Sequence, residues 1–262
     1  MKLQAKRMVL AGMLVTIGTV AACSDSTSPA ASGQTVGLSF SGVKPPGVGG
    51  AMSVGGVLAD SMTLTDGTNT LVITSVEVLL REIELKRANT ADCDSTANSD
   101  ACEKFEVGAT LVTVPLAAGA ATEVTVAIDS GTYTEIEFDI HKLGGDSVDN
   151  AFLAANPTWP ANTSIRVTGS YNGTAFTFTT SLDIEQEIQF VPPLVIDASG
   201  SATNVTIRLD VSTWFRNGVG GPLIGPATAN QGGANQSLVE NNIKNSIKGF
   251  EDSDRDGDER DG

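Results

Sequence analysis

The residues 251–262 carry the spacing of a calcium-binding loop. Asp252-Ser-Asp254-Arg-Asp256-Gly257-Asp258 places carboxylates at alternate positions, with a glycine that permits a sharp turn. Such carboxylates converge on one Ca²⁺ ion. The bidentate acid that completes such a loop would fall at position 263, and no exiting helix follows, so we expect weak affinity. The alternative is a solvated acidic tail, because seven of these twelve residues are acids.

Paired carboxylates elsewhere could perform acid–base chemistry. Glu137 and Asp139 lie on one predicted strand, and Asp183, Glu185 and Glu187 lie at or near another. Two carboxyl groups that face each other across a cleft can hydrolyse a glycosidic bond. The alternation of Glu185 and Glu187 instead fits the outward polar face of a strand. We therefore expect no enzyme, and a carboxylate-dependent hydrolase is the alternative.

One histidine and one tryptophan complete the candidate residues. His141 is the only histidine and cannot form a multi-histidine metal site, and no serine stands in a G-x-S-x-G motif. We expect no catalytic residue. Trp159 lies in a proline-flanked loop, where an exposed indole could stack on a sugar. Aromatic residues make up only 5% of the chain, which is low for a sugar-binding platform.

The first 23 residues have the features of an export signal. Lys2, Lys6 and Arg7 precede the apolar run 8–20, which is too short for a confident membrane span but fits a secretory signal. Val20-Ala21-Ala22-Cys23 resembles the lipobox of bacterial lipoproteins. The resemblance implies cleavage before Cys23 and two or three acyl chains, which anchor a protein stably. The alternative is an ordinary secreted protein in which Cys23 is incidental.

The expected anchor sets the compartment of the remaining chain. In the bacterial lipoproteins that this signal resembles, a serine directly after the cysteine permits transfer to the outer membrane. Ser24 holds this position, so we expect the outer rather than the inner membrane. The three cations of the signal leave with residues 1–22, and the net charge falls from −15 to −18. Nucleic acid is excluded as a partner, because binding its backbone requires Lys and Arg. Cations and basic partners remain compatible with this charge.

Two further cysteines enclose a short polar segment. Cys93 and Cys102 flank eight small or acidic residues. In an exported protein this pair predicts a disulfide, which would stabilise the fold by about 2–3 kcal/mol. A redox or metal pair is the weaker alternative, because there is no CxxC motif and His141 is distant in sequence.

Short alternating segments dominate the rest of the chain and predict an all-β sandwich. A change of face near residues 80–81 indicates a bulge in one long strand. Asn172-Gly173 predicts a type I′ turn between two strands. The expected strands are 35–41, 61–65, 70–86, 104–107, 110–114, 123–128, 132–143, 165–171, 174–182, 184–191 and 205–211.

One segment has helical spacing. Ser237 and Glu240 are spaced as a capping box, ahead of Val239, Ile243, Ile247 and Phe250 on one helix face. Gly249 would end the helix. We therefore predict a single amphipathic helix that packs on the sandwich.

Two stretches are similar to an uncharacterised family of bacterial envelope domains. They are Val72-Ile-Thr-Ser-Val-Glu-Val78 and Ser130-Gly-Thr-Tyr-Thr-Glu-Ile136. The resemblance covers about residues 59–212 and implies a prealbumin-like or carboxypeptidase-regulatory-like sandwich in which Tyr133 is structural. It implies no activity and no catalytic residues.

Together these features predict a cell-envelope lipoprotein that is a non-enzymatic binding or structural module. A calcium- or glycan-binding module is the second hypothesis and a hydrolase the third. We expect no cofactor, with calcium as the alternative, and the expected partners are the membrane, through the anchor, and an envelope protein or glycan. The predicted segments are a signal peptide (1–22), a lipidated cysteine and flexible tether with a short strand (23–58), the sandwich (59–215), a loop and helix (216–250) and an acidic tail (251–262).

Overall fold

The computed structural model describes residues 34–43, 61–88, 108–117, 121–128, 130–197, 203–253, 255 and 257. Strands dominate these residues. They are β1 (Gln34–Ser41), β2 (Met62–Thr65), β3 (Thr70–Arg87), β4 (Thr110–Thr113), β5 (Ala121–Ile128), β6 (Gly131–Ile140), β7 (Ile165–Tyr171), β8 (Thr174–Thr180), β9 (Ile184–Ile196), β10 (Thr203–Leu209) and β11 (Ile247–Glu251). The helices are α1 (Ser147–Ala155), α2 (Gln236–Asn245) and the 3₁₀ turns η2 (Val211–Thr213) and η3 (Pro226–Thr228).

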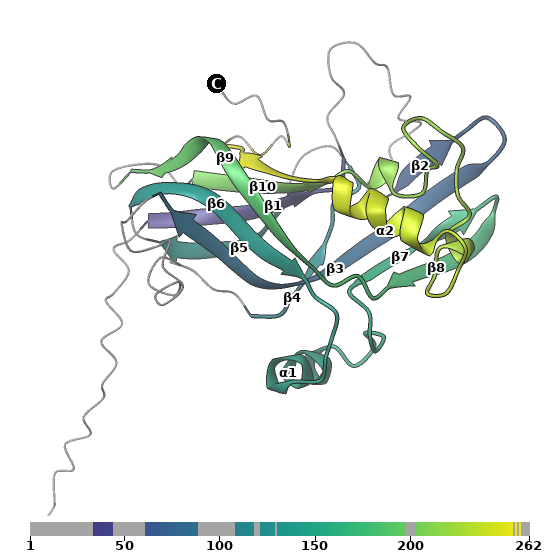
Figure 1. The fold of residues 1–262 in the computed structure, drawn as a ribbon, viewed down its shortest axis with the longest axis horizontal. Coiled ribbons are helices and arrows are strands. Elements are labelled where there is room, and N and C mark those ends of the chain that lie inside the picture. The colour runs from purple at the N-terminus through teal and green to yellow at the C-terminus, as the bar shows by residue number, and fades with distance from the viewer. Residues whose placement is uncertain are drawn as a thin grey trace, which may run out of the picture. The chain divides into compact units, whose positions relative to one another are not determined.

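The strands form two packed sheets (Figure 1). The smaller sheet has the order β11-β10-β1-β5, and β1 runs parallel to β10. The larger sheet has the order β8-β7-β3-β6-β9, with β2 and β4 also paired to β3. The predicted all-β sandwich is confirmed. Because β1 lies between β10 and β5, the sandwich begins at Gln34, earlier than the boundary at 59 that we expected.

The long strand β3 organises the larger sheet. Its first part pairs with β7, and its last part pairs with β6. The register shifts between Arg81 and Glu84, and Glu82 has a φ of 53°. This confirms the bulge expected from the change of face near residues 80–81. The bulge allows one continuous strand to present an apolar face to the core on both sides of the irregularity.

The hairpin of β7 and β8 is also confirmed. Tyr171 pairs with Thr174, so Asn172 and Gly173 alone form the turn. Both have positive φ, 51° and 80°, as a type I′ turn requires.

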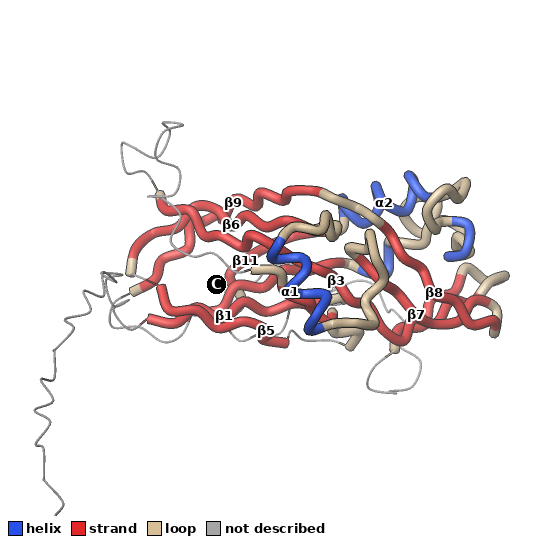
Figure 2. The backbone as a smooth tube through the Cα atoms, turned by 90° about the horizontal axis from the view of Figure 1, so that it is seen from below, coloured by secondary structure: helices blue, strands red, loops and turns tan. Residues whose placement is uncertain are grey.

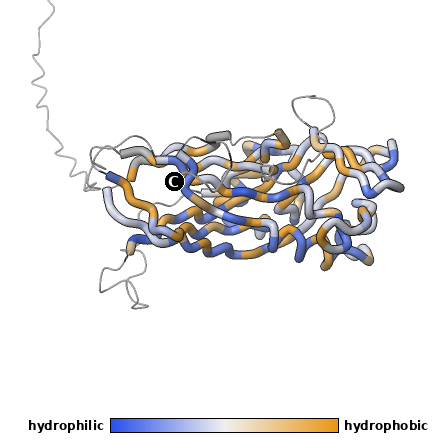
Figure 3. The backbone as a smooth tube through the Cα atoms, turned by 90° about the horizontal axis from the view of Figure 1, so that it is seen from above, coloured by the Kyte–Doolittle hydropathy of each residue, from blue (hydrophilic) through white to orange (hydrophobic). Residues whose placement is uncertain are grey.

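A single large core fills the space between the sheets. Hydrophobic and hydrophilic residues alternate along the strands, so one face of each strand supplies the core (Figure 3). Tyr133 on β6 is fully buried, and its ring lies under the guanidinium of Arg87. The largest fully buried side chains are those of Trp214, Tyr133, Phe40, Phe138, Phe178 and Phe215.

The C-terminal segment differs from the predicted single helix. Helix α2 ends at Asn245, and residues from Ile247 onward form β11 on the edge of β10. The capping box is wrong, because the N-cap is Asn235 and Ser237 lies inside the helix. Glu240 instead accepts a hydrogen bond from Thr180 of β8, which ties α2 to the larger sheet (Figure 2). The open edge of β10 outweighs the helical spacing of the last apolar residues, because pairing satisfies its backbone groups.

Helix α1 covers a small second core that the sequence did not predict. Asp146 is its N-cap and accepts a hydrogen bond from the N–H of Asp149. Phe152 packs there with the buried side chains of Leu79, Leu143 and Trp159. Within the described residues, no helix has the length and apolar character needed to cross a membrane.

Several predictions concern positions outside the described residues. These are the lipidation of Cys23, the disulfide of Cys93 and Cys102, the strand at 104–107, and the carboxylates of Asp254, Asp256 and Asp258. They stay predictions.

Candidate functional site

The segment after β11 folds back on itself. Asp252 is fully buried, and its Oδ2 accepts a hydrogen bond from the N–H of Gly257 at 3.0 Å. Arg255 and Gly257 have φ values of 60° and 77°. Glycine adopts such values readily, whereas other residues do so only where the surrounding structure imposes them. The first and sixth positions of the predicted calcium loop are therefore in contact.

Buried polar residues hold this turn against the smaller sheet. The N–H of Asp252 donates to the carbonyl of Asn204 on β10 at 3.0 Å, and the Asn204 amide returns a hydrogen bond to the Asp252 carbonyl at 3.0 Å. Ser39 of β1 donates to Asn204 Oδ1 at 2.7 Å. The Arg208 guanidinium reaches the Gly257 carbonyl at 3.3 Å. The turn is thus anchored to strands in the middle of the smaller sheet.

A second acidic group lies on the outward face of β6 and β9. Ligand atoms of Glu135, Glu137 and Glu187 lie within 4.8 Å of one another. The ammonium of Lys86 contacts Glu137 and lies 3.2 Å from Glu135. Burial lowers the pKa of Lys86, but the hydrogen bonds and charges of both carboxylates outweigh burial and raise it. Lys86 therefore already neutralises part of this group.

The negative charge on this face is only partly balanced. Burial is the main cause that raises the pKa of Asp139, and the negative charge of Glu82 raises it further. A hydrogen bond with Glu137 and the charge of that residue raise the pKa of Glu185. Both carboxyl groups therefore hold protons more tightly than usual, and the face attracts cations.

The expected hydrolase carboxylates do not face each other across a cleft. Glu137 lies directly opposite Glu187, and Asp139 directly opposite Glu185, on neighbouring strands of one sheet. A substrate cannot enter between adjacent strands, as glycoside hydrolysis would require. This arrangement supports the outward polar face that we expected from the alternation.

His141 belongs to a hydrogen-bonded network at the start of α1. Its Nε2 lies 2.9 Å from Oδ1 of the buried Asp149, which also accepts hydrogen bonds from the N–H groups of Gly144 and Gly145. Arg81 lies 3.6 Å from the same carboxylate. Burial raises the pKa of Asp149, but these hydrogen bonds outweigh it and lower the pKa overall. The network holds the loop before α1 against the larger sheet.

Trp159 is buried, whereas the glycan-binding alternative requires an exposed indole. Only 4% of the residue is exposed, and the indole N–H donates to the Thr163 carbonyl at 2.9 Å. Phe152 meets the ring edge-on, and the guanidinium of Arg166 lies over it at 4.8 Å. Helix α1 supplies the apolar cover that the loop alone lacks. A buried ring cannot stack on a sugar, so the expected glycan platform has no basis at this residue.

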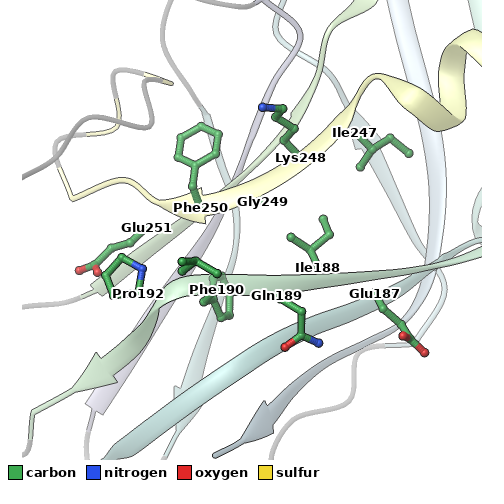
Figure 4. Close-up of a pocket in the computed structure, with 11 residues that line it drawn as sticks. Glu187, Ile188, Gln189, Phe190, Pro192, Ile247, Lys248, Gly249, Phe250 and Glu251 are labelled. Atoms are coloured by element: carbon green, nitrogen blue, oxygen red, sulfur yellow. The ribbon is translucent and has the colours of Figure 1, made fainter.

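A groove of about 500 Å³ lies between β9 and β11, at residues 187–192 and 247–251. Each strand is at the edge of its own sheet. Ile188 points toward β11, whereas Glu187 and Gln189 point away from it (Figure 4). A Cβ on Gly249 would lie 3.2 Å from the Ile188 side chain, so that side chain packs closely against the backbone of Gly249. Strand β11 thus forms one wall of the groove and leads directly into the Asp252 turn.

Comparisons with known proteins give little further information. No protein-family model matches the chain, and no curated protein matches it. Among solved structures, MbnP from Methylosinus trichosporium is similar, with 12% sequence identity over 70% of this chain and 76% of that chain, at a TM-score of 0.32. A likeness at this TM-score carries no argument about function.

Proposed function

We propose that the chain is a cell-envelope lipoprotein, anchored by acylated Cys23, and a non-enzymatic calcium-binding module. The calcium site is the loop that begins at Asp252. One observation carries the proposal: Oδ2 of the buried Asp252 accepts the N–H of Gly257, six positions into the D-x-D-x-D-G sequence.

This closure matters because calcium loops depend on a sharp turn at their sixth residue. The turn lets acids at alternate positions reach one ion, and glycine permits it. Here the glycine stands at that position and has the left-handed backbone that the turn needs. The hydrogen bonds of Asp252 to Asn204 hold the start of the loop on a rigid strand, which reduces the entropy lost when an ion binds.

The affinity should be weak. We expect a dissociation constant of about 0.1–1 mM, the range of extracellular calcium modules. A protein outside the cytoplasm can use a site of this strength.

Calorimetric titration of CaCl₂ into residues 24–262 tests the proposal. Two double variants that each remove two carboxylates are compared: Asp254→Ala with Asp256→Ala in the loop, and Glu185→Gln with Glu187→Gln on the outward face of β9. We expect the loop variant to lose binding and the β9 variant to retain it.

Two results would overturn the assignment. Loss of binding in the β9 variant alone would move the calcium site to the acidic face of the larger sheet. Absence of calcium binding in the unaltered protein, at 10 mM free ion, would reduce the Asp252 turn to a structural element.

A further inference from the structure

The last part of β9 carries more apolar side chains than the core uses. Residues 190–196, Phe-Val-Pro-Pro-Leu-Val-Ile, are apolar throughout. The core takes Phe190, Leu194 and Ile196, which are buried. The other four side chains are exposed, and we call them the β9 ridge: Val191, Pro192, Pro193 and Val195.

The ridge differs from the rest of the strand. Earlier in β9 the exposed side chains are polar, those of Glu185, Glu187 and Gln189. Beyond the register shift against β6 the exposed side chains are apolar, with Val191 90% and Val195 62% exposed. Single exposed apolar side chains are common on proteins, whereas a group of them marks a contact surface.

The ridge suits contact through side chains rather than pairing with another strand. Strand β9 lies at the edge of its sheet. Pro192 and Pro193 have no backbone N–H, so a further strand cannot form a regular ladder with this part of the edge. Burial of apolar side chains needs no directional partner. The boundary between the headgroups and acyl chains of a bilayer is a surface that accepts such side chains.

The ridge lies at the end of the sandwich where β1 begins. Gln34, the first residue of β1, pairs with Ile128 of β5. Gly131 of β6, three positions further along the chain, pairs with Ile196 of β9. Two cross-strand pairs and three residues of chain span at most roughly 22 Å. The ridge, which ends one residue before Ile196, is therefore at the same end of the sandwich as Gln34 (Figure 1).

The expected anchor holds this end of the sandwich near the bilayer. Ten residues, 24–33, separate Cys23 from Gln34. A fully extended chain of this length spans at most about 35 Å. Strand β3 begins at the opposite end of the sandwich, and its 18 residues measure roughly 55 Å. The ridge thus stands on the end that the tether keeps close to lipid.

We propose that the β9 ridge docks on the lipid surface to which acylated Cys23 anchors the protein. Val191 and Val195 enter the boundary between headgroups and acyl chains. The chain has a net charge of −15, so apolar burial rather than attraction to anionic headgroups drives the contact. This inference rests on the acylation of Cys23 in the proposed function and does not depend on the calcium loop.

Fluorescence of introduced tryptophans tests the docking. The full chain, produced in bacteria with its own signal, is reconstituted in phosphatidylcholine vesicles with plain or brominated acyl chains, in calcium-free buffer. The variants are Val191→Trp and Val195→Trp, and Val219→Trp is the matched control. Val219 is fully exposed, and Arg216 ties its loop to the Thr65 carbonyl at the opposite end of the sandwich. Both native tryptophans are buried, so the added emission reports the new residue.

Brominated lipid should remove more than half of the added emission in Val191→Trp and Val195→Trp and little of it in Val219→Trp. The physical reason is that docked apolar side chains lie about 5–10 Å into the boundary between headgroups and acyl chains. In the Val195→Trp protein, the further change Val191→Ser should reduce the quenching. Unchanged quenching would mean that the introduced indole alone makes the contact, and would overturn the proposal.

The remaining outcomes separate the docking from the anchor. Protein that floats with the vesicles but shows equal quenching at the ridge and at Val219 overturns the docking and leaves the anchor in place. Protein that does not float with the vesicles overturns the acylation of Cys23, and the docking with it. A blue shift at the ridge that grows with protein concentration, without quenching, would assign the ridge to contact between two copies of the chain and overturn the lipid contact.

Discussion

Asp149 provides the sharpest test of how the loop before α1 is held. We consider Asp149→Asn, which keeps the shape of the side chain and removes its charge. In the structure the carboxylate accepts hydrogen bonds from Gly144, from Gly145 at 3.0 Å and from His141 at 2.9 Å. Hydrogen bonds to a charged group contribute about 1.5–3 kcal/mol each. The amide oxygen of Asn can still accept from the glycines, so we expect a net loss of about 2 kcal/mol in the free energy of unfolding.

The pH dependence of that loss follows from the pKa of Asp149. The folded state lowers this pKa below its ordinary value. The charged carboxylate therefore stabilises the fold above the unfolded pKa of about 4, and this stabilisation disappears as the pH falls through the lower, folded pKa. The difference between the two proteins should be full at pH 7 and should shrink toward pH 3.

Asp139→Asn is the matched control, because folding raises the pKa of Asp139, whereas it lowers the pKa of Asp149. Burial and nearby acids raise the pKa of Asp139, so its charge destabilises the fold at pH 7. Urea unfolding of the three proteins at pH 7 and pH 3 should show Asp149→Asn less stable than the unaltered protein at pH 7, and Asp139→Asn equally or more stable. A loss below about 0.5 kcal/mol in Asp149→Asn at pH 7, or a loss as large at pH 3, would refute this account of the network.

Three further outcomes follow from the sequence and the structure. Trp159→Ala should cost about 3–5 kcal/mol in urea unfolding, because a buried ring and its hydrogen bond are removed, and a cost below about 1 kcal/mol would mean that the ring is exposed. Cys23→Ser should abolish incorporation of radiolabelled palmitate and move the protein from the membrane to the soluble fraction; a variant that is still labelled would place the lipid elsewhere. In the mature protein without reductant, Cys93 and Cys102 should resist iodoacetamide and become labelled after reduction; labelling before reduction would show free thiols.

Local signals in the sequence were sufficient for most strands. The turn at Asn172-Gly173 needs positive φ at two successive residues, and this pair adopts it easily, so the hairpin follows from the dipeptide itself. The bulge in β3 also has a local signature, since the apolar face changes side within a few residues of Arg81. In both cases the physical cause and the visible pattern lie within the same short segment.

Elements that depend on distant partners were missed. Residues 247–251 have apolar positions that fit a helix, but they form β11 because β10 offers an unpaired edge. Nothing near residue 247 in the sequence shows that β10 lies beside it. The burial of Trp159 is not visible in the sequence for the same reason, because its cover comes from Phe152 on α1 and its cation from Arg166 on β7.

The same limit applies to the Asp252 turn and to the groove between β9 and β11, which differ in how far apart their residues are. The calcium loop is a contiguous run, so its spacing is visible in the sequence, and the structure adds the contact of Asp252 with Gly257. The groove has no sequence signature, because residues 187–192 and 247–251 are distant in sequence and meet only when β11 forms on the edge of β10. The prediction of a helix through residue 248 would have separated them. The strand β11, which replaces the end of the predicted helix, therefore also forms one wall of the groove.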